Sequence, residues 1–340
     1  MNENYFLSLI ICCYNKEKRL RITLDSIVNQ SIFKHIEVIC INDHSEDNTP
    51  DILDEYASKY YNIKVQHLPK NSSVFVARLI GLKIASAPYI TFIDPDDYVE
   101  PDYYLEMVEN ITEEWSDITL TPSVYRICDN KEMNESTGIY KLWNTNTTFN
   151  INKQIFENLM KYIPCMTLWN AIFKSEIIKE VLRLPATYIN FIEDNIFFTI
   201  ALMNSNKMTC KITQSYYHYY YKNDVEHLSS PCSGFLKSSQ YIDKVFNLLS
   251  LYIQSNESKY GKFKKGITIS KNKYITSISD NIYKSLIKTD EFKTFFTNDV
   301  KPKDNIYELM KDEKNAESLD KVKLLITVIK KLNDLVVDCS

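Results

Sequence analysis

Three carboxylates directly follow an apolar run near residue 90. The run over residues 89–93 is Tyr-Ile-Thr-Phe-Ile, whose β-branched and aromatic residues predict a short buried strand. Asp94, Asp96 and Asp97 come next. Carboxylates at the end of a buried strand repel one another unless a cation lies among them, and Mg²⁺ or Mn²⁺ combines such groups with phosphate oxygens. The spacing indicates a metal–diphosphate site, although an acidic turn gives the same pattern.

Polar residues also follow the other apolar runs of the first half. Residues 5–13 are almost entirely apolar and end in Tyr14 and Asn15. Residues 36–41 form a similar run that ends in a polar segment containing Asp43. Such runs are typical of strands buried on both faces of a sheet. Because open α/β sheets bind ligands at the carboxyl ends of their strands, this edge is the expected binding site.

Helical patterns separate these strands. Apolar residues recur at helical spacing over residues 17–30, a Thr-Pro pair opens a helix at Thr49, and Ser72 or Ser73 caps a third helix. The alternation of strand and helix predicts a doubly wound α/β sheet. Residues 124–150 are polar and turn-rich, and the alternation loosens from there.

The second half of the chain combines weaker signals. A helix is expected over residues 193–204, and residues 208–222 include a tyrosine-rich β stretch. A mainly helical extension is expected over residues 231–340, ending in an amphipathic, Lys-bearing helix over residues 320–337. That helix covers its own domain in the simplest interpretation. A homodimer contact and a peripheral membrane contact are the alternatives.

Composition excludes several classes of protein. The net charge of −4 gives no reason to expect nucleic-acid binding, and the five glycines include neither a dinucleotide fingerprint nor a P-loop. The eight cysteines show no C-x-x-C spacing, which favours a reducing compartment. No apolar run approaches the roughly 20 residues that span a bilayer, and the first run lacks the features of a signal peptide. We therefore expect a cytoplasmic protein.

Four short segments follow one another in a recognisable order. They are Ser-Leu-Ile-Ile-Cys-Cys-Tyr-Asn over residues 8–15, Asn-Asp-His-Ser-Glu-Asp over 42–47, Ala-Arg and Gly-Leu within 77–82, and Asp-Pro-Asp-Asp over 94–97. Together they resemble the family 2 glycosyltransferases of the GT-A fold, in particular bacterial members that build surface polysaccharides. The resemblance is strong over the first 110 residues, weaker over roughly 165–230, and absent from the last hundred.

The resemblance implies a GT-A (Rossmann-like) mixed sheet flanked by helices over residues 1–230. Residues 1–122 would bind the nucleotide and residues 123–230 the acceptor, with residues 231–340 as the helical extension. Two departures leave the choice of nucleotide open. His44 follows Asp43 where the family usually has glycine, and serines stand near residue 73 where glycine is common.

The resemblance also implies roles for individual residues. The nucleotide would be bound by Tyr14, Asn15, Asp43, Arg78, Asp96 and Lys222. Asp43 would accept a hydrogen bond from uracil, and Arg78 would orient either the acidic cluster or the diphosphate. A Mn²⁺ or Mg²⁺ ion would be held by Asp97 with Asp96 nearby. His218 would be a further ligand, although a histidine in an aromatic strand is more often part of a core.

Catalysis and acceptor binding fall on the second half. The resemblance implies a base in the pair Glu193-Asp194, with Asp194 preferred and Glu193 as the alternate. A helix N-terminus stabilises an ionised carboxylate there, but acidic residues also favour helix starts for structural reasons alone. Trp169 and Asn170 resemble the acceptor-side segment, and a core position for Trp169 is equally compatible with the sequence.

The implied function is that of an inverting, metal-dependent glycosyltransferase. It would move a hexose or N-acetylhexosamine, with galactose-type sugars favoured, from a UDP-sugar to an oligosaccharide or lipid-linked glycan. The product would belong to lipopolysaccharide, lipooligosaccharide or capsule, made in the cytoplasm or at the inner face of the inner membrane. A metal-dependent phosphohydrolase and a non-catalytic nucleotide-sugar-binding protein are the alternatives.

Overall fold

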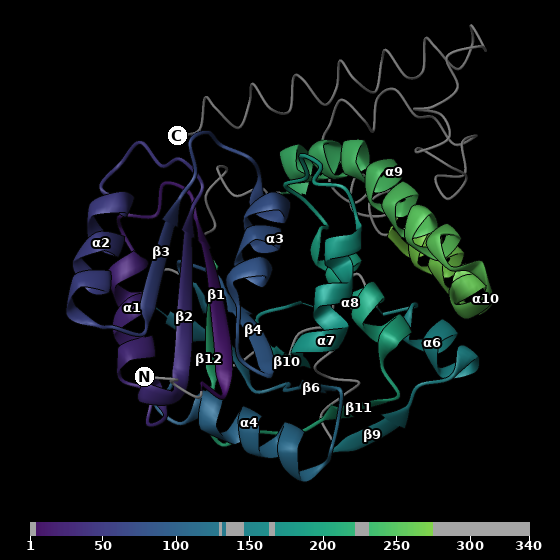
Figure 1. The fold of residues 1–340 in the computed structure, drawn as a ribbon, viewed down its shortest axis with the longest axis horizontal. Helices are drawn as coiled ribbons and strands as arrows, with labels where there is room; N and C mark the ends of the chain where they lie inside the picture. Colours follow the sequence, from purple (N-terminus) through teal and green to yellow (C-terminus); the bar gives the residue numbers. More distant parts are fainter. Residues whose placement is uncertain (1–4, 129–130, 134–145, 163–166, 222–230, 275–340) are drawn as a thin grey trace, which may run out of the picture.

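The computed structural model describes residues 5–128, 131–133, 146–162, 167–221 and 231–274. An eight-stranded mixed sheet forms the centre, in the order β3-β2-β1-β4-β10-β6-β11-β9 (Figure 1). Its first four strands pair in parallel: β1 (Leu7–Cys13), β2 (Ile36–Asn42), β3 (Ile63–His67) and β4 (Tyr89–Ile93). The α/β architecture expected from the apolar runs is confirmed.

The rest of the sheet mixes directions. It consists of β10 (Ala171–Lys174), antiparallel to β4, then β6 (Ile118–Leu120), β11 (Lys207–Cys210) and β9 (Thr147–Asn150). A second sheet contains β5 (Tyr98–Val99), β12 (Tyr217–Tyr221), β7 (Val124–Cys128) and β8 (Lys131–Met133). Strands β7, β8 and β9 lie in the polar segment that gave no strand signal. The edge strand β9 alternates half-buried and exposed residues, so it lacks an apolar run.

Helices cover both faces of the main sheet. One core cluster joins β1 and β2 to α1 (Leu20–Val28), α2 (Thr49–Lys59) and α4 (Tyr103–Glu113). A second cluster joins the opposite face to α3 (Val74–Ile84), α7 (Ser175–Ile178) and α8 (Asp194–Asn204). Strand β1 contributes to both, because Leu9 and Ile11 belong to the first cluster and Ile10 to the second. This is the two-sided burial that its sequence predicts.

Helix α3 packs closely against β1 at Gly81. A Cβ atom at this position would lie 2.5 Å from Cγ2 of Ile10, so only glycine allows this approach without a shift of the neighbouring side chain. Arg78 lies one turn earlier in the same helix. The close contact between helix and strand therefore fixes the base from which the Arg78 side chain extends.

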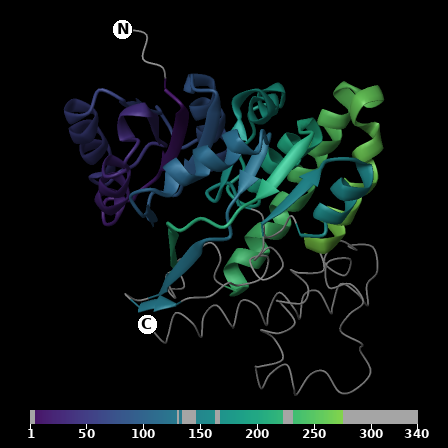
Figure 2. The same ribbon diagram turned by 90° about the horizontal axis from the view of Figure 1, so that it is seen from below.

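The described part of the helical extension shares the main core. Helices α9 (Pro231–Ser255) and α10 (Glu257–Tyr260) of this extension lie at the end of the molecule opposite α1 and α2, as does α6 (Lys153–Leu159), which precedes the extension in the chain (Figures 1 and 2). Ile242, Val245 and Leu249 of α9 are buried in the cluster that contains α8. The helix expected over residues 320–337, with its expected surface contacts, lies outside the described residues. None of the described helices has the length and apolar character needed to cross a bilayer.

Candidate active site

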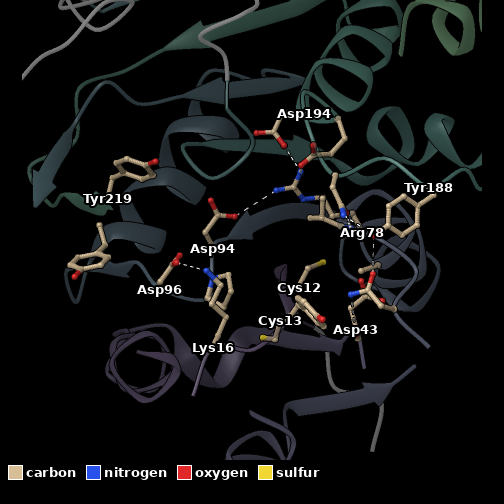
Figure 3. Close-up of a pocket in the computed structure, with 18 residues that line it drawn as sticks. Cys12, Cys13, Lys16, Asp43, Arg78, Asp94, Asp96, Tyr188, Asp194 and Tyr219 are labelled. Carbon is tan, nitrogen blue, oxygen red and sulfur yellow. Dashed lines mark hydrogen bonds and ion pairs between the residues drawn. The ribbon is translucent and has the colours of Figure 1, made fainter. Parts of the chain in front are cut away.

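A cavity of about 540 Å³ opens beside the carboxyl ends of β1, β2 and β4 (Figure 3). Helix α3 and the start of α8 complete its wall. Among the described residues, five acidic and two basic side chains line it: Asp43, Asp94, Asp96, Glu193, Asp194, Lys16 and Arg78. The cavity lies at the edge of the sheet where the sequence places a ligand site.

Asp43 lies directly after β2 with 4% of its surface exposed. Its Oδ1 accepts a hydrogen bond from the N–H of Ser72 at 2.7 Å, and its Oδ2 accepts one from the N–H of Ser73 at 3.0 Å. Burial raises the pKa of Asp43, and the two N–H groups oppose this shift. Because each carboxylate oxygen has a second lone pair, Asp43 can still accept a hydrogen bond from a ligand.

The backbone is strained at both positions where this chain lacks a glycine that is common in the family it resembles. His44 has φ of 63° and Ser73 has φ of 86°, conformations that glycine adopts at least cost. The N–H of Ser73 binds Asp43, and its Oγ accepts a hydrogen bond from the N–H of Ile189 at 3.1 Å. These contacts hold the strained turn in place, so the loop keeps its shape without glycine.

Asp94 and Asp96 face the cavity, and each has a cationic partner. Oδ2 of Asp96 accepts a hydrogen bond from Nζ of Lys16 at 2.5 Å. Oδ1 of Asp94 lies 3.6 Å from Nη2 of Arg78. Figure 3 shows dashed lines from Asp96 to Lys16 and from Asp94 to Arg78. Within the described ranges, no group of three His, Cys, Asp or Glu side chains is arranged to hold a metal ion, so a cation here would need ligands from a substrate.

Asp97, the expected metal ligand, points away from the cavity. It is fully buried, and its Oδ2 accepts a hydrogen bond from the hydroxyl of Tyr217 at 2.6 Å. Its Oδ1 accepts one from the N–H of Tyr220 at 2.7 Å. Both oxygens thus hold β12 against the loop after β4. In this arrangement Asp97 is not positioned to ligate an ion in the cavity, which Asp94 and Asp96 line.

Arg78 is the centre of an acidic cluster. Its Nη1 donates to Oε1 of Glu193 at 2.7 Å and also to Oδ1 of Asp194, while Nη2 approaches Asp94. The guanidinium is buried, and its Cζ lies 5.7 Å from the ring centroid of Phe92. In this structure Arg78 therefore contacts the acidic cluster, which is one of the two partners that the sequence left open for it.

The two members of the acidic pair differ in their surroundings. Glu193 is the N-cap of α8, and its side chain is 10% exposed, against 23% for Asp194. Burial raises the pKa of Glu193 to about 7, with Arg78 opposing and Asp194 adding to the shift. Burial likewise raises the pKa of Asp94 to about 6, again opposed by Arg78. Asp194 is the more open carboxylate of the pair.

The raised pKa of Glu193 predicts a pH-dependent stability difference in Glu193→Gln. Between the usual value near 4.5 and about 7, the native state binds more protons at Glu193 than the unfolded chain does. This contribution to stability is therefore present at low pH and lost as pH rises through 7. Urea unfolding at pH 5 and at pH 8 gives the free energy of unfolding of both proteins. The value for wild type minus the value for Glu193→Gln should be more positive at pH 5 than at pH 8. A difference that does not change with pH would contradict the shift.

The expected acceptor residues lie behind the cavity wall. Trp169 is 7% exposed and stacks on Tyr217, with 4.4 Å between ring centroids, and on Tyr219 at 5.6 Å. Asn170 is 6% exposed and donates from Nδ2 to the carbonyl of Thr121 at 3.1 Å. Neither lines the cavity, whereas Tyr219 does. The contribution of Trp169 to the site is thus the support of Tyr219.

The remaining expected residues divide between the cavity and the loops. Tyr14 lines the cavity with 45% of its surface exposed. Asn15 instead accepts a hydrogen bond from the N–H of Glu46 and stabilises the loop. His218 is 4% exposed, stacks on Tyr98 and lies 3.0 Å from Glu100 through Nε2, outside the cavity lining. Lys222 lies outside the described residues.

Sequence reasoning missed several lining residues. They are Lys16, Tyr188, Asn190, Tyr219 and Tyr220, together with the apolar part of the wall. The signal for the first was its place directly after the Tyr-Asn pair that ends β1. The tyrosine-rich stretch after residue 215 predicts a strand, but no local signal indicates that Tyr219 and Tyr220 both reach the cavity.

Comparisons with known proteins identify the family of this chain. Residues 8–181 match the model of the family described as glycosyl transferase family 2. A poly(ribitol-phosphate) β-glucosyltransferase of Bacillus spizizenii is 32% identical over 226 residues, which are 66% of this chain and 33% of that protein. The poly(ribitol-phosphate) β-N-acetylglucosaminyltransferase TarS of Staphylococcus aureus is 28% identical over 228 residues, 66% of this chain and 37% of TarS. The chain matches only about a third of the length of these relatives.

Solved structures share the fold. The crystal structure of S. aureus TarS 1–349 in complex with UDP-GlcNAc aligns with a TM-score of 0.57 and 20% sequence identity, over 82% of this chain and 80% of that chain. The family match covers more than half of the 340 residues, including β1, β2, β4 and the acidic residues that follow β4. The chain belongs to glycosyltransferase family 2.

Proposed function

We propose that this chain transfers a hexose or N-acetylhexosamine from a UDP-sugar to a hydroxyl of a bacterial surface polymer, with inversion at the anomeric carbon. One observation carries the proposal. A single cavity is lined by a hydrogen-bond acceptor for a base, Asp43, and by an arginine-held carboxylate, Asp194, on the helix across from it. A donor held by the first would present its sugar toward the second.

The nucleotide end of this cavity suits uridine. Asp43 accepts the uracil N–H through a lone pair that Ser72 and Ser73 leave open. The exposed ring of Tyr14 offers a stacking surface at the rim. The crystal structures of TarS 1–349 with UDP-GlcNAc and with UDP concern a protein of the same fold, and they support the choice of UDP.

Asp194 is the proposed general base. It takes the proton of the acceptor hydroxyl while that oxygen attacks the anomeric carbon from the face opposite UDP. Arg78 orients Asp194 by donating a hydrogen bond from Nη1 to its Oδ1. Glu193, held by the same Nη1 atom and less exposed, positions Arg78.

The charges of the cavity fit a divalent cation. Five acidic and two basic side chains line it, and a diphosphate would add further negative charge. Asp96, with Asp94 beside it, presents the carboxylate oxygens that Mn²⁺ and Mg²⁺ prefer, and the phosphates would supply the remaining ligands. These two residues, in place of Asp97 and His218, would hold the ion. When bound, such an ion stabilises the charge that develops on the departing diphosphate.

The donor and acceptor follow from the relatives. Both enzymes named above carry poly(ribitol-phosphate) in their names, one as a glucosyltransferase and one as an N-acetylglucosaminyltransferase. The proposed donors are therefore UDP-sugars of gluco configuration as well as the galactose-type sugars favoured by the sequence. The proposed acceptors are a polyol-phosphate polymer of the teichoic acid type as well as lipopolysaccharide and capsule. Residues 1–122 would serve the donor, residues 123–230 the acceptor, and residues 231–340 packing, association or contact with a membrane surface.

A ligand panel tests the proposal. Thermal unfolding and donor hydrolysis are measured with UDP-, GDP-, dTDP- and CMP-sugars in Mn²⁺, Mg²⁺ or EDTA. A UDP-sugar with Mn²⁺ should raise the unfolding midpoint, because a ligand that binds only the folded state stabilises it. The effect should be lost in Asp43→Ala and in EDTA. Release of inorganic phosphate would instead indicate a phosphohydrolase, and stabilisation without turnover a pure binding protein. No stabilisation by any nucleotide sugar would overturn the proposal.

A further inference from the structure

Lys16 supplies a cation to the carboxylate that we propose as a metal ligand. Its Nζ lies 2.5 Å from Oδ2 of Asp96, and the two side chains are 34% and 17% exposed. The Lys16 main chain is anchored separately, because its N–H donates to Oγ1 of Thr49 at 2.8 Å. The Lys16 ammonium thus lies in the cavity at the end of four flexible methylene groups, while the main chain of the residue is fixed (Figure 3).

The main chain of Asp96 is anchored as well, and its side chain is less exposed than that of Lys16. Its carbonyl accepts a hydrogen bond from Nε of Arg19 at 2.8 Å, and the Arg19 guanidinium stacks over Tyr220 with 3.6 Å from Cζ to the ring centroid. A cation that binds the Asp96 carboxylate must therefore do so near its present position. Lys16 already occupies this place.

The two cations of the cavity differ in mobility. The side chain of Arg78 is 7% exposed and lies among Glu193, Asp194 and Asp94, so its departure would leave three carboxylates without a partner. Lys16 has one described carboxylate partner and a third of its side chain in solvent. A lysine ammonium is a compact charge with rotatable donors that binds phosphate oxygens. Lys16 is the cation that can change partner.

We propose that Lys16 holds the cation position at Asp96 before the donor is bound, and that it moves to the donor's diphosphate when a divalent cation takes Asp96. The inference rests on the proposed function for the diphosphate and for the divalent cation. An ammonium and a metal ion on the same carboxylate repel each other, so the two compete for Asp96. The oxygens of a bound diphosphate would offer new acceptors to the displaced ammonium.

Lys16 therefore has opposite effects on two ligands. Without nucleotide it competes with the metal ion for Asp96, and with nucleotide it contributes a charge-assisted hydrogen bond to the diphosphate. Loss of the Lys16 charge should tighten the binding of Mn²⁺ alone and weaken the binding of UDP at saturating Mn²⁺. A side chain that only maintained the structure of the site would weaken both.

Lys16→Met tests this in the full chain. Mn²⁺ binding without nucleotide is followed by electron paramagnetic resonance of the free ion, and UDP and uridine binding at saturating Mn²⁺ by calorimetry. Relative to wild type, the variant should bind Mn²⁺ about tenfold more tightly and UDP about tenfold more weakly, the size of effect expected for a partly exposed ion pair. Uridine, which has no phosphates, should bind equally well to both.

Matched variants complete the test. Lys18→Met removes an exposed lysine two residues away and should change neither affinity. Lys16→Gln repeats the loss of charge with a polar side chain and should reproduce Lys16→Met. Unchanged or weaker Mn²⁺ binding in both Lys16 variants overturns the inference while wild-type binding of Mn²⁺ and UDP leaves the proposed function standing. If wild type binds no Mn²⁺, the inference fails together with the metal dependence of the proposed function.

Discussion

Asp194→Asn is expected to lower the rate of sugar transfer by a factor of about 10²–10⁴, the usual contribution of a general base. The amide cannot take a proton from the acceptor hydroxyl. It has nearly the shape of the carboxylate, and its oxygen can still accept the hydrogen bond from Nη1 of Arg78. UDP binding should therefore be retained. The measurement is the single-turnover rate of transfer, with UDP affinity determined on the same preparation.

Glu193→Gln is the matched control, because it makes the same chemical change at the adjacent residue. Glu193 is less exposed than Asp194 and is held by the same atom of Arg78. Its loss of charge should change the rate much less than Asp194→Asn does. If Glu193→Gln instead causes the larger loss, the roles within the pair are exchanged. A normal rate in both variants would remove the base from this helix altogether.

Much of the fold and part of the site could be predicted because their signals are local. β4 occupies the predicted residues 89–93, β2 extends the predicted run 36–41 by one residue, and α2 begins at the predicted Thr49. Asp43 and Asp96 follow such strands, and Asp194 begins a helix. A residue that directly follows a parallel strand lies at the carboxyl edge of the sheet, so its position in the sequence also predicts its place near the ligand site.

The roles of the three carboxylates after β4 depended on geometry that spacing does not give. Asp94 and Asp96, two residues apart, both line the cavity. Asp97 points into the protein, where its partner Tyr217 lies 120 residues later in the chain. A long-range partner of this kind leaves no trace in the local pattern. Sequence reasoning could place an acidic cluster here but could not distinguish the carboxylate that binds β12.

Trp169 and Lys16 are two further residues whose placement could not be predicted from the sequence. Trp169 carries a strong chemical signal but stacks behind Tyr219, which is 50 residues away in sequence. In the sequence nothing distinguishes Lys16 from an exposed surface lysine, and only the fold places it beside Asp96, 80 residues away. Side-chain type alone predicts neither placement, because each is decided by the pairing of elements distant in the chain.

Arg78→Met is expected to destabilise the protein by about 3–5 kcal/mol, the usual cost of removing one partner from a buried ion cluster. The methionine fills part of the space but leaves Asp94, Glu193 and Asp194 without the cation that joins them. Urea unfolding at pH 8 measures the loss. Arg183→Met is the control, because the Arg183 side chain is 57% exposed in its ion pair with Glu180, and the loss of an exposed partner costs little.

A destabilising Arg78→Met variant alone would not separate lost charge from lost packing, so two further measurements are needed. Combining it with Glu193→Gln removes one of the carboxylates left without a partner, and the double variant should regain part of the lost stability. Arg78 lowers the pKa of both Glu193 and Asp94, so without it both values rise further and the native state takes up protons as pH falls. The deficit of Arg78→Met should accordingly shrink from pH 8 to pH 5. A deficit that is equal at both pH values, with no rescue by Glu193→Gln, would mean that Arg78 acts by packing and that the acidic pair does not depend on its charge.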